Sequence, residues 1–237
     1  MIKFDRVTKY YNNNVGVDDL SLEIERGEFA FLVGASGAGK STLIKLMLKE
    51  IDADSGSIIV GGREVTKLTK KTVPTHRRKI GIVFQDFRLL ANKTVYENVS
   101  FAMEIIHSKK KEISERVPAI LSLVGINMYR DKYPDELSAG EQQRVAIARA
   151  IVNDPEVLIA DEPTGNLDPG TAGEIMQLFE EINHTGTTIL MVTHAKDIVD
   201  RMNKRVITLD HGKIIRDRVG LYSNWQQVDF DWNMNTE

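Results

Sequence analysis

The stretch FLVGASGAGKSTLIKLM, residues 31–47, decides the fold class of this chain. An apolar run at 29–33 enters a loop of the pattern G-x-x-x-x-G-K-[ST], and an amphipathic helix is expected at 40–49. The glycines let the loop turn tightly, so that backbone N–H groups and the positive helix end face one anion. Because the spacing is not G-x-G-x-x-G, the pattern predicts a phosphate-binding loop rather than a dinucleotide-binding turn.

This loop assigns roles to its own residues. Lys40 should reach the β- and γ-phosphates of a nucleotide, and the Ser41 hydroxyl should ligate Mg²⁺. The residues expected to contact the nucleotide here are Gly34, Ala35, Ser36, Gly37, Ala38, Gly39, Lys40, Ser41 and Thr42.

A second apolar strand, in the stretch VLIADE at 157–162, ends in two carboxylates. Such a strand end lies at the carboxyl edge of a parallel sheet, beside the phosphate loop. We expect Asp161 to orient the metal ion and Glu162 to polarise the attacking water. Two acids that merely cap a helix are the plainer alternative, and the presence of the phosphate loop disfavours it.

Composition excludes several classes of protein. The 237 residues carry 31 basic and 34 acidic side chains, which argues against a general nucleic-acid binder. No cysteine is present, so disulfides and thiolate nucleophiles are excluded. The longest stretch without Asp, Glu, Lys or Arg, residues 182–195, is too short for a membrane span, which needs about 20 apolar residues. We therefore expect a soluble chain.

Strands and helices alternate around a helical block. Further strands are expected at 2–7, 20–24, 57–60, 80–84 and 188–192, with a hairpin of 206–209 and 213–215. The pattern from 86 to 155 is helical instead. The sequence thus predicts an α/β nucleotide-binding core, residues 1–85 and 156–220, with a helical insertion at 86–155 and a tail at 221–237.

The segment LSAGEQQR, residues 137–144, distinguishes among nucleotide-binding proteins. Ser138 and Glu141 form an S-x-x-E capping box, which predicts a helix towards Ile151. The same segment resembles the LSGGQ signature of the ATP-binding cassette (ABC) superfamily, with Ala139 and Glu141 as departures from it. Both interpretations leave a helix N-terminus, the Ser138 hydroxyl and the Gly140 amide to receive a γ-phosphate.

Other landmarks of the superfamily occur in order along residues 2–220. The resemblance implies that Tyr11, or Tyr10 in the alternative register, stacks on adenine. It implies that Gln85 contacts Mg²⁺ and water, that Asp168 belongs to a loop at the nucleotide, and that His194 contacts the γ-phosphate. The implied fold is a P-loop NTPase (RecA-like) core with an N-terminal antiparallel β subdomain and an inserted α-helical subdomain.

The resemblance also implies an ATPase working as a head-to-tail homodimer that sandwiches two ATP molecules with Mg²⁺. Narrower strings, such as TVYENV at 94–99 and EPTGNLD at 162–168, are similar to the bacterial cell-division branch of the superfamily. That branch implies a polytopic membrane subunit as partner, no nucleic acid, and a cytoplasmic chain peripheral to the inner face of the membrane. It would couple dimer closure to control of peptidoglycan hydrolases. The alternative is the ATPase subunit of an exporter of the lipoprotein-release or macrolide-efflux type.

Two stretches keep alternatives open. The basic run at 67–79 is either a solvated helix face, which we favour, or a contact with anionic lipid. The tail at 221–237 holds both tryptophans of the chain, Trp225 and Trp232. It is a poorly ordered terminus, a strand that caps the sheet, or a segment that docks a partner with aromatic anchors.

Overall fold

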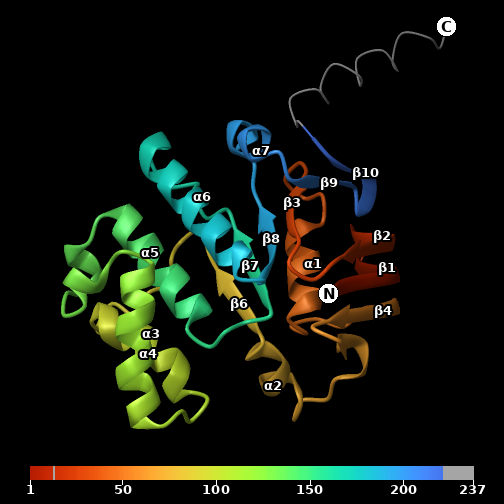
Figure 1. Ribbon diagram of the computed structural model, residues 1–237. Helices are drawn as coiled ribbons and strands as arrows, with labels where there is room; N and C mark the ends of the chain where they lie inside the picture. The colour runs from red at the N-terminus through yellow and green to blue at the C-terminus, as the bar shows by residue number, and fades with distance from the viewer. Residues whose placement is uncertain (13, 221–237) are drawn as a thin grey trace, which may run out of the picture.

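A computed structural model describes residues 1–12 and 14–220, so the aromatic tail predicted at 221–237 lies outside the described residues. The central sheet contains β3 (Phe29–Val33), β6 (Ile80–Val83), β7 (Val157–Asp161), β8 (Thr188–Val192), β9 (Arg205–Asp210) and β10 (Lys213–Val219). Its strand order is β10-β9-β3-β8-β7-β6, and only the edge strand β10 is antiparallel to its neighbour. The carboxyl ends of the parallel strands therefore meet at one edge (Figure 1).

The central sheet separates two apolar cores. In β3, Phe31 belongs to one buried cluster and its neighbour Leu32 to the other. Met191 and Val192 of β8 are divided in the same way. Because side chains alternate across a strand, a run that is apolar at every position is buried on both faces of the sheet. This is why the apolar runs of the sequence predicted the inner strands well.

A second, antiparallel sheet lies beside the first. Its order is β2-β1-β4-β5, with β1 at Ile2–Tyr11, β2 at Asn14–Ile24, β4 at Ser55–Val60 and β5 at Arg63–Glu64. The first two strands pair from Ile2↔Ile24 to Tyr11↔Asn14, so both are longer than predicted. Their outer halves mix exposed, half-buried and buried residues, and they lack the apolar signal on which the sequence prediction relied.

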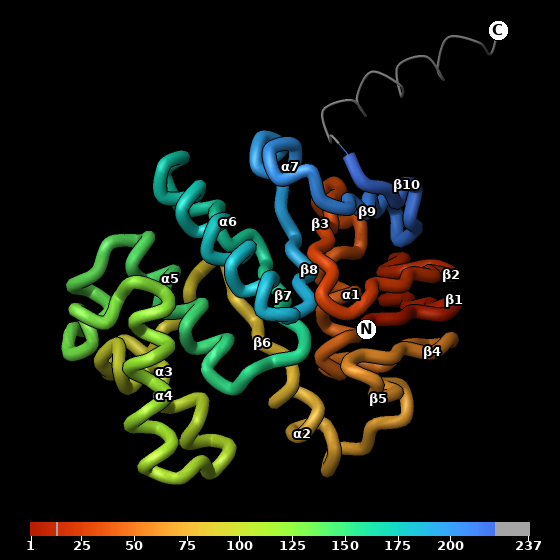
Figure 2. The backbone as a smooth tube through the Cα atoms, viewed as in Figure 1, coloured from red at the N-terminus to blue at the C-terminus, as the bar shows by residue number. Residues whose placement is uncertain are grey.

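The helices divide between the core and one lobe. The helices are α1 (Lys40–Met47), α2 (Val73–Arg77), α3 (Val95–Glu104), α4 (Lys110–Leu123), α5 (Ala139–Ile151), α6 (Pro169–His184) and α7 (Lys196–Met202), with short 3₁₀ turns η1 (Val65–Lys67), η2 (Asn127–Tyr129) and η3 (Pro134–Glu136). Figure 2 shows α3, α4 and α5 together on the side of the central sheet away from β1 and β2. We call these three helices the helical lobe. No helix among the described residues is long and apolar enough to cross a membrane.

The predicted helical block at 86–155 contains the helical lobe but is not helical throughout. Its first helix begins at Val95, so residues 86–94 form an irregular connection after β6. The proposed subdomain boundaries at 85/86 and 155/156 stay a prediction.

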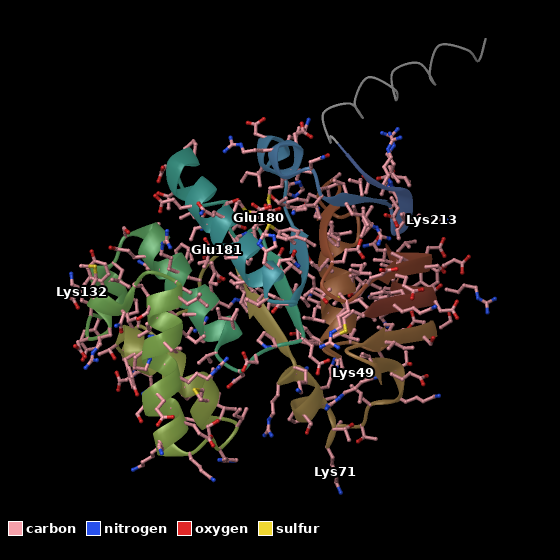
Figure 3. All side chains as sticks on the ribbon, in the orientation of Figure 1. Lys49, Lys71, Lys132, Glu180, Glu181 and Lys213 are labelled. Atoms are coloured by element: carbon pink, nitrogen blue, oxygen red, sulfur yellow. The ribbon has the colours of Figure 1, made fainter. Side chains whose placement is uncertain are left out.

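Three of the six Lys and Arg side chains in the basic run at 67–79 bind the protein itself, namely Lys67, Arg77 and Lys79. The Nε of Arg77 donates to the carbonyl of Leu48, 2.9 Å away, and the Nζ of Lys79 lies 3.4 Å from a Glu156 carboxylate oxygen. Lys71 extends from the end of the molecule near α2 (Figure 3). These contacts favour the interpretation as a solvated surface.

Candidate active site

Five separate segments of the chain line one pocket of about 430 Å³ at the carboxyl edge of the central sheet. They are the β1–β2 hairpin, the phosphate loop with the start of α1, and the ends of β6, β7 and β8. The lining residues are Tyr11, Val15, Gly16, Ser36, Gly37, Gly39, Lys40, Ser41, Thr42, Gln85, Asp161, Glu162, Val192 and His194. Eleven of the eighteen residues predicted for the site thus come together.

Two glycines give the phosphate loop its shape. A Cβ at Gly34 would lie 2.2 Å from the carbonyl oxygen of Leu209, and one at Gly39 would lie 2.2 Å from that of Gly16. Gly39 is the N-cap of α1 in the left-handed region, with φ of 109°. No side chain caps this helix, so its first amides are available to an anion.

The Lys40 ammonium lies within this loop. Its Nζ donates to the carbonyl oxygens of Gly34, at 2.6 Å, and of Ala35, at 2.9 Å. Burial lowers the pKa of Lys40, and the charges of Glu162 and Asp161 oppose that shift. Lys40 therefore places a positive charge beside the two carboxylates at the end of β7.

Those two carboxylates are half-buried. Burial raises the pKa of Asp161 and that of Glu162. Glu162 also adopts the left-handed region with φ of 50°, a conformation that costs energy in a non-glycine residue and is typical of functional sites. Its backbone N–H donates to the carbonyl of Val192 at 2.9 Å, which fixes the turn against β8.

His194 contacts Glu162 directly. The backbone N–H of His194 donates to Glu162 Oε2 at 3.2 Å, while its Nε2 lies 3.3 Å from Oε1. The second contact lacks hydrogen-bond geometry, so Oε1 is buried with no hydrogen-bond partner among the described residues. A buried carboxylate oxygen of this kind can accept a proton from a water molecule placed in the pocket.

Gln85 connects the pocket to the loop after β7. Its backbone carbonyl accepts a hydrogen bond from the Asn166 side chain at 3.0 Å, and a Cβ at Gly165 would lie 2.9 Å from Gln85 Nε2. No motif of the sequence predicts this contact. The two residues are 81 positions apart, and no local pattern marks the pair.

The pocket distinguishes between the two tyrosines of the alternative registers. Tyr11 lines it, and a Cβ at Gly16 would come within 2.8 Å of the Tyr11 ring. The hydroxyl of Tyr10 instead donates to Asp18 at 3.2 Å. Sequence reasoning missed Val15 and Gly16 as lining residues, because the exposed hairpin end carries no motif.

The other predicted residues do not line the pocket. Gly34, Ala35 and Ala38 belong to the phosphate loop, whereas Ser138, Gly140, Glu141 and Asp168 lie at the starts of α5 and α6. Ser138 and Glu141 form the predicted capping box of α5, in which the Ser138 hydroxyl donates to the Glu141 carboxylate at 2.8 Å. Asp168 accepts from the first amides of α6. The two helix ends are adjacent, since a Cβ at Gly140 would lie 2.4 Å from the Thr171 side chain. In the single chain the Ser138 hydroxyl is thus engaged within its cap, although the sequence predicts that it receives a γ-phosphate.

Oxygen donors for a metal ion meet in the pocket. Ser41, Gln85 and Asp161 all line it. Within the described residues there is no cluster of three or more His, Cys, Asp or Glu side chains that could hold a metal. Mg²⁺ needs no such cluster, because it binds through one or two protein oxygens together with phosphate and water.

Known proteins resemble this chain in sequence and in fold. A family model described as "ABC transporter" matches residues 17–165. The cell division ATP-binding protein FtsE of Streptococcus pneumoniae serotype 2 (strain D39 / NCTC 7466) is 52% identical over 213 residues, which are 90% of this chain and 93% of that protein. The methionine import ATP-binding protein MetN of Haemophilus influenzae (strain 86-028NP) is 44% identical over 220 residues, which are 91% of this chain and 64% of that protein.

A solved structure gives the same answer for the fold. The ATP-binding cassette MJ0796, as a dimer in a post-hydrolysis state bound to ADP and Pi, matches with a TM-score of 0.81 and 33% identity. The match covers 92% of this chain and 98% of that one. It confirms the fold class predicted from the sequence.

Proposed function

The chain belongs to the ABC transporter family and is an ATPase of the cell-division type, and from this premise we propose that it drives an FtsEX-type membrane complex. In this proposal two copies close on ATP, and the closure is relayed through a polytopic, FtsX-like subunit to peptidoglycan hydrolases. The chain would act on the cytoplasmic side, peripheral to the inner face of the membrane. The similarity to FtsE of Streptococcus pneumoniae over 90% of the chain supports this.

One observation carries the chemical part of the proposal. The pocket combines a phosphate loop, a lysine and two half-buried carboxylates whose pKa values are raised by burial. In our proposal the loop amides and Lys40 bind the phosphates of ATP, and Tyr11 stacks on the adenine. Glu162 then accepts a proton from the attacking water, while His194 and Gln85 orient the γ-phosphate and that water.

The residues of the pocket also fit a magnesium ion. Ser41, Gln85 and Asp161 would hold it, since all three line the pocket and each side chain carries an oxygen atom. When bound, the ion would neutralise phosphate charge. The positive charge of the ion would lower the pKa of Asp161 and so oppose the effect of burial, which raises it.

The cap residues require a second copy in this proposal. Ser138, Gly140, Glu141 and Asp168 do not line the pocket of their own chain. We infer that they face the ATP held by a partner copy, in a head-to-tail homodimer. The dimeric form of MJ0796 supports this arrangement.

The membrane subunit would dock between the core and the helical lobe, at residues 85–90. This irregular connection follows β6 directly and carries Gln85, so a partner there would contact both the pocket and the lobe. No nucleic acid takes part in the proposed function.

Recovery of the native complex from membranes tests the proposal. The chain should co-purify with a four-span membrane protein that bears an extracytoplasmic loop. Recovery with a substrate-binding lipoprotein, or with an exporter of the lipoprotein-release or macrolide-efflux type, would overturn the cell-division role. It would leave the ATPase assignment in place.

A further inference from the structure

The turn that follows Gln85 is strained. Phe87 and Arg88 are consecutive non-glycine residues in the left-handed region, with φ of 55° and 49°. A non-glycine residue in this region is disfavoured, because its Cβ crowds the neighbouring carbonyl oxygen. Surrounding contacts must therefore hold this turn, since the chain would relax to another conformation without them.

Arg149, in the last turn of α5, makes such contacts. Its Nη2 donates to the carbonyl oxygen of Phe87 at 2.8 Å, and its Nη1 donates to that of Arg88 at 2.6 Å. The planar guanidinium thus binds both strained residues with one rigid fork, a geometry that a lysine could not reproduce.

Among the described residues, the Arg149 guanidinium donates hydrogen bonds only to these two carbonyl oxygens. Its hydrogen bonds go to the two backbone oxygens, and no ion pair of Arg149 with a carboxylate occurs in residues 1–12 and 14–220. Burial lowers the pKa of Arg149. Arg149 is half-buried, and a half-buried guanidinium without an acidic partner carries a desolvation cost that a neutral side chain in a purely structural contact would avoid.

The same helix is fixed to the strand that leads into Gln85. A Cβ at Gly81 of β6 would lie 2.5 Å from the carbonyl oxygen of Ala150, so the last turn of α5 lies directly on β6. At its other end α5 begins with the Ser138 capping box. A helix of 13 residues, about 20 Å long, therefore joins this cap to the turn after Gln85.

We propose that Arg149 is a positioning residue, which holds the turn at 86–88 so that the Gln85 side chain stays in the pocket. Gln85 is then anchored from two sides, by Asn166 from the core and by Arg149 from the helical lobe. A movement of the helical lobe reaches Gln85 through Arg149. The inference rests on the role proposed above for Gln85.

A double-mutant cycle on the full-length chain tests this. Steady-state ATP hydrolysis with Mg²⁺ is measured for Arg149→Met, Gln85→Ala and the double variant, with thermal unfolding of each. Arg116→Met is the matched control, because Arg116 of α4 also binds a backbone carbonyl, that of Val152, and pairs with Asp154, away from Gln85. Arg149→Lys is the conservative variant.

We expect Arg149→Met to lower kcat about tenfold, an effect of the size expected for the loss of one charged hydrogen bond. KM should stay within about twofold of the wild-type value. In the Gln85→Ala background the same change should alter kcat by less than about twofold, since the two residues act as one unit. Arg149→Lys should recover part of the rate, and Arg116→Met should keep kcat near wild type.

The contrary outcomes are distinct. An equal loss from Arg149→Met in both backgrounds, an unchanged kcat, or a similar loss in Arg116→Met would overturn the inference while Gln85 keeps its role. A wild-type rate in Gln85→Ala would remove the role of Gln85 itself, and the inference with it. If Arg149→Met does not fold, Arg149→Lys carries the same cycle.

Discussion

The carboxylates of the pocket and those in the caps of α5 and α6 have pKa values that are shifted in opposite directions. In the pocket, burial raises the pKa of Asp161 and of Glu162. At the start of α5, hydrogen bonds from the backbone and side chain of Ser138 lower the pKa of Glu141. The carboxylates of the pocket are thus less stabilised in their charged form by the chain itself, whereas the Glu141 carboxylate in the cap is stabilised by hydrogen bonds.

The pocket and the caps therefore serve different purposes, one in ligand binding and the other in stability. A site built from buried, incompletely paired charges lowers the stability of the protein but is ready for a charged ligand. A capped helix end contributes stability and offers a rigid surface. The pocket is therefore the region where substitutions should change chemistry, and the caps are the region where they should change stability and assembly.

Glu162→Gln should have the largest effect on the chemistry of the pocket. The amide keeps the size of the side chain but cannot accept a proton, so kcat should fall about 10³-fold while ATP affinity stays within about twofold. ATP turnover measures kcat, and titration calorimetry with ATP measures the affinity. Light scattering detects the ATP-held dimer. Glu180→Gln, on the outer side of α6 and paired with Lys204, is the control and should keep its rate. Wild-type hydrolysis in Glu162→Gln would refute Glu162 as the base.

Lys40→Ala should weaken ATP binding about 100-fold, because it removes charged hydrogen bonds to phosphate. Titration calorimetry with ATP and Mg²⁺ gives the affinity. Lys45→Ala is the matched control, since Lys45 is exposed on the same helix and lies outside the pocket. Unchanged affinity in Lys40→Ala would count against the phosphate-loop assignment.

Ser138→Ala tests the other side of the comparison. Loss of the cap should lower the free energy of unfolding by about 1 kcal/mol, without changing ATP affinity of the single chain. Thr94→Ala removes an equivalent capping box from α3 and should cost about as much. Only Ser138→Ala should weaken the ATP-dependent dimer, as measured by light scattering in the Glu162→Gln background. Equal weakening by both variants would argue that the caps act through stability alone.

The smallest effect concerns pH. Since burial raises the folded-state pKa of Glu162, the folded protein binds more protons than the unfolded chain between the ordinary Glu pKa and the raised one. The contribution of this group to stability is thus present at low pH and is lost as pH rises through that window. Glu162→Gln should be more stable than wild type by about 1 kcal/mol above the window and should show no gain below it. Urea unfolding at several pH values measures the difference.

Local patterns predicted the regions in which each residue's role is set by its neighbours in the chain. The strands Phe29–Val33 and Thr188–Val192 have the predicted bounds because their side chains are buried on both faces. The Ser138 capping box is confirmed for a similar reason, since the cap needs only four consecutive residues.

Long-range contacts escaped prediction. Tyr11 and Tyr10 are adjacent and chemically identical, and their different positions follow from Gly16 and Asp18 across the hairpin. The contacts of Arg149 with the turn after Gln85 join residues about 60 positions apart. The roles of the site residues within the ATPase cycle stay predictions that the variants above address.

The apolar core of the helical lobe has a consequence for protein engineering. Val99 of α3 and Leu121 of α4 belong to the same buried cluster as Phe31 of β3 and Phe179 of α6. The lobe therefore has no hydrophobic core of its own, and it shares one with a face of the central sheet. A chimera that exchanges residues 86–155 between relatives would have to carry the matching sheet face and α6 as well, because the graft would otherwise meet a surface shaped for different side chains.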